Sequence, residues 1–172
     1  GNLAITMEQD QDQEILIARS FDDGTEVWRV EEETKWHDML SGTGPRSTPT
    51  LYNGKIYTLF SNGRLSCVEA NTGKANWNTQ VIPNNYEFPE WGLSISPLIW
   101  NDKIILSLGG ESAAVKAYKI DSGEQIWESQ IAGHGVYLSP DVLRLINENH
   151  LLIAVVGKIV SLNPRTGKTL WE

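Results

Sequence analysis

The sequence contains four copies of one short turn, in which a glycine is followed four positions later by a tryptophan. The pairs are Gly24 with Trp28, Gly73 with Trp77, Gly123 with Trp127, and Gly167 with Trp171. Glycine adopts positive φ at little cost, so a Thr-Gly or Ser-Gly step after a polar residue indicates a hairpin turn, and each tryptophan opens the next strand. Tryptophans at positions 28, 77, 127 and 171 lie 49, 50 and 44 residues apart. Self-similarity at this period, with β-type turns, predicts the blades of a β-propeller.

The clearest repeat unit lies in the second quarter of the chain. Strands are expected at 48–52, 55–59 and 64–68, followed by a strand through Trp77. Asn53-Gly54 between the first two is a strong signal for a type I′ hairpin turn. Four up-and-down strands in about 33 residues are typical of one propeller blade.

The same pattern divides the whole chain, residues 1–172, into four blade segments of one domain. They are 1–30, 48–80, 96–131 and 139–172. The first segment has no counterpart of the strand that opens the others, so it is expected to lack its innermost strand. The prediction is an all-β propeller segment of fifteen strands, without helix because no stretch keeps a 3.6-residue apolar period.

Charge and composition exclude several classes of partner. Fourteen basic and 22 acidic residues give a net charge of −8, which disfavours nucleic acid and anionic membrane surfaces. No apolar run approaches the 18 or more residues of a membrane-spanning helix. There is no secretory signal, and Gly1 as first residue is compatible with removal of a leader. The single cysteine, Cys67, permits no internal disulfide.

The four turn windows, 18–28, 67–77, 117–127 and 161–171, resemble the tryptophan-docking repeat Ala-x-Asp-x-x-Thr-Gly-x-x-x-Trp of pyrroloquinoline quinone (PQQ) propellers. The first position is small in every copy: Ala18, Cys67, Ala117 and Ser161. We interpret the small side chain as leaving room for an indole from the neighbouring sheet. The third position departs from the repeat, being Ser20, Glu69, Lys119 and Asn163. The four tryptophans are therefore expected to be structural docking residues between blades, in preference to a stacking platform for a ligand.

The chain accordingly resembles the PQQ-binding-like propeller family of the quinoprotein alcohol dehydrogenase-like superfamily. The resemblance implies a parent propeller of seven or eight blades. Because an open array exposes the apolar flanks of its terminal blades, we expect a second copy or the rest of the parent chain to cover them, with a two-fold pair of half-rings as the simplest assembly. It also implies a periplasmic or secreted location. Members include quinoprotein dehydrogenases and a lipoprotein scaffold of outer-membrane protein assembly, and a shared fold does not decide between them. We expect a non-enzymatic binding or scaffolding module. The alternative is a fragment of a PQQ-dependent alcohol dehydrogenase whose cofactor residues lie outside this chain.

No catalytic, cofactor-binding or metal-binding residue is expected within the chain. By resemblance, the dehydrogenase site requires adjacent cysteines, Glu and Asn ligands for Ca²⁺ and a catalytic Asp. Cys67 has no neighbouring cysteine, and no such ligand set aligns. Asp10, Asp12 and Glu14 have calcium-loop spacing but lack the glycine of that loop, so a solvated hairpin tip is the favoured interpretation.

The remaining site hypothesis rests on topology. In up-and-down blades, the connectors between blades emerge on one face, here 31–47, 81–95 and 132–138, and binding residues concentrate on such loops. The candidate ligand or partner residues are His37, Asp38, Arg46, Glu90, Trp91, His134 and Tyr137. The competing interpretation is that these side chains only satisfy the loop backbone.

Overall fold

A computed structural model describes residues 2–110, 114–133, 137–155 and 157–172. These residues form four antiparallel sheets and one short hairpin. The first sheet contains β1 (Leu3–Asp10), β2 (Gln13–Ser20) and β3 (Glu26–Glu33), and the hairpin contains β4 (His37–Asp38) and β5 (Gly42–Thr43). The second sheet contains β6 (Thr50–Tyr52), β7 (Lys55–Leu59), β8 (Arg64–Glu69) and β9 (Ala75–Gln80). The third contains β10 (Leu98–Trp100), β11 (Lys103–Ser107), β12 (Val115–Lys119) and β13 (Gln125–Glu128). The fourth contains β14 (Asp141–Leu145), β15 (Glu148–Val155), β16 (Lys158–Leu162) and β17 (Thr169–Trp171).

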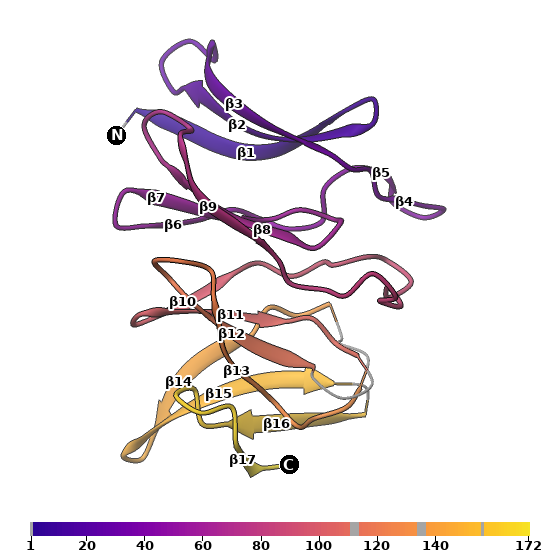
Figure 1. Cartoon of the computed structure of the whole chain (residues 1–172), viewed down its shortest axis with the longest axis vertical. Coiled ribbons are helices and arrows are strands. Elements are labelled where there is room, and N and C mark those ends of the chain that lie inside the picture. The colour runs from indigo at the N-terminus through magenta and orange to yellow at the C-terminus, as the bar shows by residue number, and fades with distance from the viewer. Residues whose placement is uncertain (1, 111–113, 134–136, 156) are drawn as a thin grey trace.

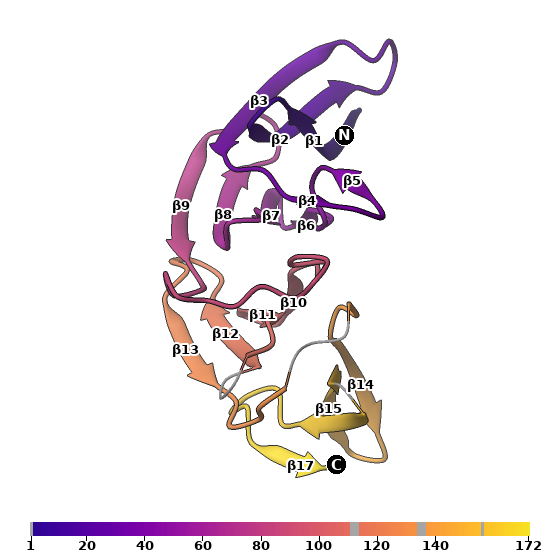
Figure 2. The same ribbon diagram turned by 90° about the vertical axis from the view of Figure 1, so that its right-hand side faces the viewer.

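The sheets follow one another in chain order, from the N-terminus at one end of the molecule to the C-terminus at the other (Figure 1). Figure 2 shows that they lie along an arc, with β9 and β13 on its convex side and β6, β10 and β14 on its inner side. Every pairing within a sheet joins consecutive strands. This is the up-and-down arrangement of propeller blades.

The predicted fold class is confirmed. Three sheets have four strands and the first has three, and no helix occurs among the residues that the structure describes. Two details differ from the prediction. Strand β3 continues to Glu33, three residues beyond the expected end, and the first connector contains the extra hairpin β4–β5.

Positive φ at the repeated glycines builds the turns that the sequence predicts. Gly24, Gly73, Gly123 and Gly167 have φ values of 73°, 68°, 71° and 71°. Asn53 and Gly54 have φ values of 47° and 74°, which is the pair of left-handed residues that a type I′ turn requires.

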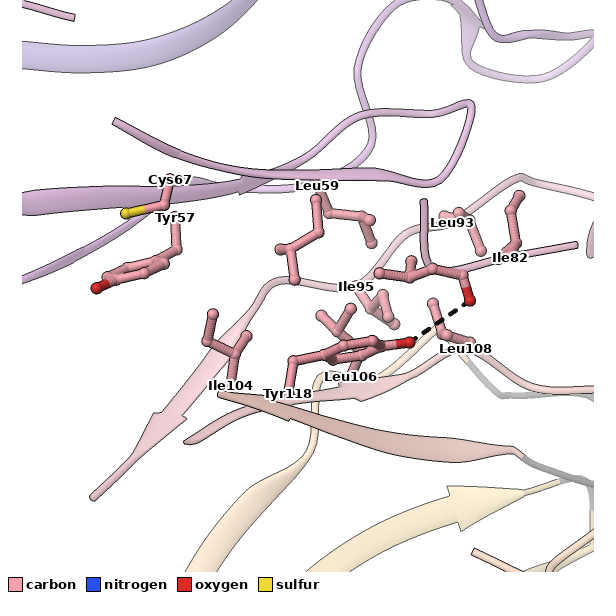
Figure 3. Close-up of a cluster of buried hydrophobic side chains, with 12 residues drawn as sticks. Tyr57, Leu59, Cys67, Ile82, Leu93, Ile95, Ile104, Leu106, Leu108 and Tyr118 are labelled. Carbon is pink, nitrogen blue, oxygen red and sulfur yellow. Dashed lines mark hydrogen bonds between the residues drawn. The ribbon is translucent and has the colours of Figure 1, made fainter. Parts of the chain in front are cut away.

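The core lies between sheets, as three clusters of buried side chains, one for each pair of neighbouring sheets. Figure 3 shows the cluster between the second and third sheets, where Tyr57 and Leu59 of β7 face Ile104 and Leu106 of β11. Residues of the second connector close one end of this cluster, among them Ile82, Leu93 and Ile95. The second connector is therefore fixed by the same packing that joins the second and third sheets.

Each of the first three repeat tryptophans contacts the next sheet along the chain. The Trp28 indole covers Gly73 and donates its Nε1–H to the carbonyl of Ala70 at 3.0 Å. Trp77 covers Gly123 and donates to the carbonyl of Ile120 at 3.2 Å. Trp127 covers Gly167. A side chain on any of these glycines would overlap the indole.

The small first position of the repeat has a different neighbour from the one expected. Ala18 pairs across the strands with Trp28, and Cys67 pairs with Trp77. The small residue thus faces the tryptophan of its own sheet, not one from the neighbouring sheet. Because both side chains project from one face of the sheet, a larger residue there would displace the indole from the next glycine turn.

Candidate functional site: the connector surface

The connector surface is the side of the molecule formed by the connectors β3–β6, β9–β10 and β13–β14. Figure 1 shows the first two on the same side, opposite the β6–β7 and β10–β11 turns. It contains the described candidate residues of the sequence analysis. His134 lies outside the described residues.

The first connector folds around the carboxylate of Asp38. Oδ1 accepts hydrogen bonds from the backbone N–H groups of Leu40 and Ser41, at 2.9 and 2.7 Å. Oδ2 accepts from the Ser41 hydroxyl at 2.7 Å and from the Arg46 guanidinium at 2.8 Å. These donors hold the pKa of Asp38 well below its ordinary value, led by the Ser41 hydroxyl.

Arg46 completes this arrangement. Its guanidinium also donates to the carbonyls of Gly44 and Gly42, at 3.0 and 2.8 Å, and both members of the ion pair are largely buried. His37 is exposed, and its Nδ1 lies 2.9 Å from the Thr43 hydroxyl across β4–β5. Asp38 and Arg46 therefore stabilise the loop from inside, where a ligand would have to break an ion pair to reach them.

Aromatic contacts join the first connector to the second. The Trp36 indole covers Gly92, where a Cβ atom would lie 2.7 Å from the ring. The Trp36 and Phe88 ring centroids are 5.4 Å apart, and Tyr86 meets Phe88 edge-on at 5.1 Å. Such tilted and edge-to-face pairs are favourable aromatic geometries.

A second aromatic pair joins the second connector to the third. The rings of Trp91 and Tyr137 have centroids 4.8 Å apart, and the Trp91 backbone N–H donates to the Tyr137 hydroxyl at 3.1 Å. Both are residues that the sequence analysis selected, and they lie side by side although 46 positions separate them. Glu90 is exposed beside them.

Apolar side chains on this surface also face solvent. They come from all three connectors: Met39, Leu40, Phe88, Trp91 and Leu138. Met39 is 98% exposed and Leu40 is 82% exposed, and both occupy the tip of the β4–β5 hairpin. Interaction surfaces are marked by contiguous exposed apolar patches, and each of the three connectors supplies at least one exposed apolar side chain here.

The unpaired charges of the first two connectors are negative. In the described part of the first two connectors, the lysine and arginine side chains are Lys35 and Arg46, and each is paired with a carboxylate. Glu87 and Glu90 are exposed next to Phe88 and Trp91. The surface therefore presents apolar side chains beside negative charge.

Five further residues of this surface could not be selected from the sequence: Met39, Leu40, Tyr86, Phe88 and Leu138. Their apolar character inside polar connectors was the available signal. It was insufficient because an apolar loop residue can also close the core, as Ile82 does, instead of facing solvent.

Two cavities lie among the connectors and at a hairpin tip, one small and one acidic. One beside Tyr137 has a volume of about 10 Å³, enough for a single water, and the buried, unpartnered hydroxyl of Ser107 lines it. A more open hollow of about 330 Å³ lies at the β1–β2 turn. Its lining residues are Asp10, Gln11, Asp12, Gln13 and Glu33.

The hollow at the β1–β2 turn does not fit PQQ. The quinone carries three carboxylates, which the carboxylates lining this hollow would repel. No group of three or more His, Cys, Asp or Glu side chains among the described residues is arranged to hold a metal ion. Cys67 is fully buried between sheets, and burial raises the pKa of its thiol. In the part of the chain that the structure describes, no helix is both long and apolar enough to cross a membrane.

Four successive antiparallel sheets, joined through a tryptophan and a glycine turn, define a segment of a PQQ-type β-propeller. The chain belongs to the family of the outer membrane protein assembly factor BamB, which matches residues 11–172.

Relatives of two kinds resemble the chain. The quinoprotein alcohol dehydrogenase PedH of Pseudomonas putida is 25% identical over 136 residues, covering 74% of this chain and 22% of that protein. Among solved structures, quinohemoprotein alcohol dehydrogenase ADHIIG of Pseudomonas putida has a TM-score of 0.68 and 15% identity, covering 99% of this chain and 36% of that one. BamB of Moraxella catarrhalis has a TM-score of 0.64 and 18% identity, covering 96% and 47%. The structural likenesses show the fold, and the chain spans about a fifth of the curated relative.

Proposed function

We propose that this chain is a non-enzymatic binding or scaffolding module that docks another protein on its connector surface. The observation that carries the proposal is that Leu40, Phe88, Trp91 and Leu138 expose apolar side chains on connectors that are joined to one another by aromatic contacts. A preformed apolar surface loses little conformational freedom on binding. The family description, an assembly factor for outer membrane proteins, supports a protein partner and an extracytoplasmic location.

The chemistry of the surface specifies the partner. Glu87 and Glu90 flank the exposed aromatics, and the cations of the first two connectors are already paired. The matching partner is an extended protein segment in which apolar side chains alternate with lysine or arginine.

The alternative is a fragment of a PQQ-dependent alcohol dehydrogenase. The curated relatives favour it, because PedH and a quinoprotein ethanol dehydrogenase of Pseudomonas aeruginosa both have quinoprotein names. In this alternative the cofactor residues lie outside the chain.

Two labelled peptides test the binding proposal: a decapeptide alternating valine with lysine, and its twin with glutamate in place of lysine. The lysine peptide is expected to bind with the modest affinity of a short peptide. The affinity of the glutamate peptide is expected to be lower by about tenfold or more. Leu40→Ser and Trp91→Ala are each expected to reduce affinity about fivefold or more. Phe21→Ser is the matched control, since Phe21 is also exposed but lies at the β2–β3 turn. Equal binding of the twins, or equal effects of the three variants, would contradict the proposal.

A further inference from the structure

The cavity of about 10 Å³ beside Tyr137 lies where the second and third connectors meet the end of β11. Its walls include Leu93, Ile95 and Leu108, each of which exposes 4% of its surface or less. Figure 3 shows these three side chains together at one end of the cluster between the second and third sheets. A polar side chain that is equally buried also lines the cavity, that of Ser107. We call this cavity the Ser107 pocket.

The hydroxyl of Ser107 has no hydrogen-bond partner among the residues that the structure describes. The two other hydroxyls at the pocket are already bonded to Trp91. Ser94 donates to the Trp91 carbonyl at 2.9 Å, and the Tyr137 oxygen accepts from the Trp91 N–H at 3.1 Å. A buried hydroxyl without a partner reduces stability by its cost of desolvation, which a hydrogen-bonding group that enters the pocket would offset.

The repeat does not require a serine at this position, which lies two residues after the cross-strand partner of the small repeat residue. The other three sheets have Met7, Leu59 and Ala154 there. An apolar residue therefore satisfies the fold, and the unpartnered hydroxyl of Ser107 departs from the pattern of its own repeat. Such departures are expected where a residue serves function instead of packing.

The volume and chemistry of the pocket decide which group can enter it. About 10 Å³ is room for one water-sized group. The side-chain hydroxyl of a serine has this size, and it can both donate to and accept from the Ser107 hydroxyl. A valine side chain is too large, an alanine leaves Ser107 without a partner, and a charged group would lose its hydration. Pro89, Ser94 and Tyr137 are partly exposed, which places the mouth of the pocket on the connector surface.

We propose that the Ser107 pocket binds the hydroxyl of one serine side chain in the extended partner segment. The inference rests on the proposed function, because it places this serine at one of the positions that alternate with lysine or arginine. The serine oxygen replaces the hydrogen bond that water would make to Ser107, so displacing water costs little. Glu90 directly follows Pro89 of the pocket, so it is positioned to pair with an adjacent basic residue of the segment.

Three decapeptides test the proposal by fluorescence anisotropy: the alternating valine–lysine peptide, and two versions with serine or alanine in place of its third valine. The serine peptide is expected to bind about threefold to tenfold more tightly than the alanine peptide, which is the effect of one hydrogen bond between neutral groups. With Ser107→Ala, these two peptides are expected to bind equally, because the hydroxyl that discriminates between them is gone.

Ser94→Ala is the matched control, since Ser94 also lines the pocket but its hydroxyl is bonded to the Trp91 carbonyl. This variant is expected to keep the preference for serine, whatever its effect on the affinity for both peptides. Ser107→Ala is expected to be no less stable than wild type in urea denaturation. The fourth sheet has Ala154 at the equivalent position, and the hydroxyl that is lost has no partner.

Equal affinities of the serine and alanine peptides for the unmodified chain overturn the proposal and leave the proposed function standing. A preference that survives Ser107→Ala, or one that Ser94→Ala abolishes equally, does the same. If none of the three peptides binds, the proposed function fails and this inference fails with it. In a crystal structure of the serine-peptide complex, the serine oxygen is expected within hydrogen-bonding distance of Ser107 Oγ, and a water molecule in its place would overturn the proposal.

Discussion

Substituting Gly73 by alanine should destabilise the chain through two separable effects. The residue has φ of 68°, and a side chain in this left-handed region costs about 1–2 kcal/mol. The added Cβ would also lie 2.7 Å from a ring carbon of Trp28, well inside the roughly 3.5–4.0 Å of an ordinary carbon contact. Overpacking of this kind costs about 1–3 kcal/mol. Gly73→Ala should therefore lower the free energy of unfolding by about 2–5 kcal/mol.

Gly24→Ala is the matched control. Gly24 has nearly the same φ, 73°, but nothing lies within 4 Å of its added Cβ. Its cost should be the backbone strain alone, about 1–2 kcal/mol. In a Trp28→Ala background, the cost of Gly73→Ala should fall to that of Gly24→Ala, because the overlapping ring is gone.

Urea denaturation followed by far-ultraviolet circular dichroism measures these free energies without relying on tryptophan fluorescence. Equal costs for Gly73→Ala and Gly24→Ala would refute the reasoning. So would an unchanged cost of Gly73→Ala when Trp28 is absent.

Two further variants test the packing and a buried charge. Trp77→Ala should lower the free energy of unfolding by about 3–5 kcal/mol in denaturant melts, because Trp77 lies between sheets. Trp91→Ala should lower it much less, because Trp91 lies on a connector. The reverse order would mean that the repeat register is misassigned. Burial raises the pKa of the Glu14 carboxyl. Its Oε2 accepts a hydrogen bond from the Ser61 N–H. Its Oε1 has no hydrogen-bond partner, and neither has the Oε1 of Gln9, which lies opposite on β1. The neutral carboxyl therefore favours the fold at low pH, and this contribution is lost as pH rises from the unfolded-state value through the raised folded-state pKa. Glu14→Gln should flatten the dependence of the unfolding free energy on pH and be more stable than wild type at pH 8; a variant with unchanged pH dependence would contradict this.

Local signals were sufficient for the sheets and turns. The repeated glycines and Asn53-Gly54 each determine a backbone conformation within a few residues, so their positive φ values could be predicted without knowing the fold. The alternation of strands between them then gives the sheet order, because consecutive strands pair through short turns.

Contacts between distant positions could not be predicted from the sequence. Asp38 and Arg46 were candidates for ligand binding, but their donors and acceptors come from the loop itself, and only the folded hairpin brings them together. The small residue before each turn was assigned to the wrong indole, since the cross-strand register that pairs Ala18 with Trp28 includes a bulge.

A calorimetric titration of the chain with PQQ in the presence of Ca²⁺ tests most directly whether it is a binding module or part of a quinoprotein. The account predicts no measurable binding at micromolar concentrations, because the hollow at the β1–β2 turn is lined by carboxylates and no group of three metal-ligating side chains occurs among the described residues. Saturable binding that requires Ca²⁺ would contradict it and favour the dehydrogenase alternative.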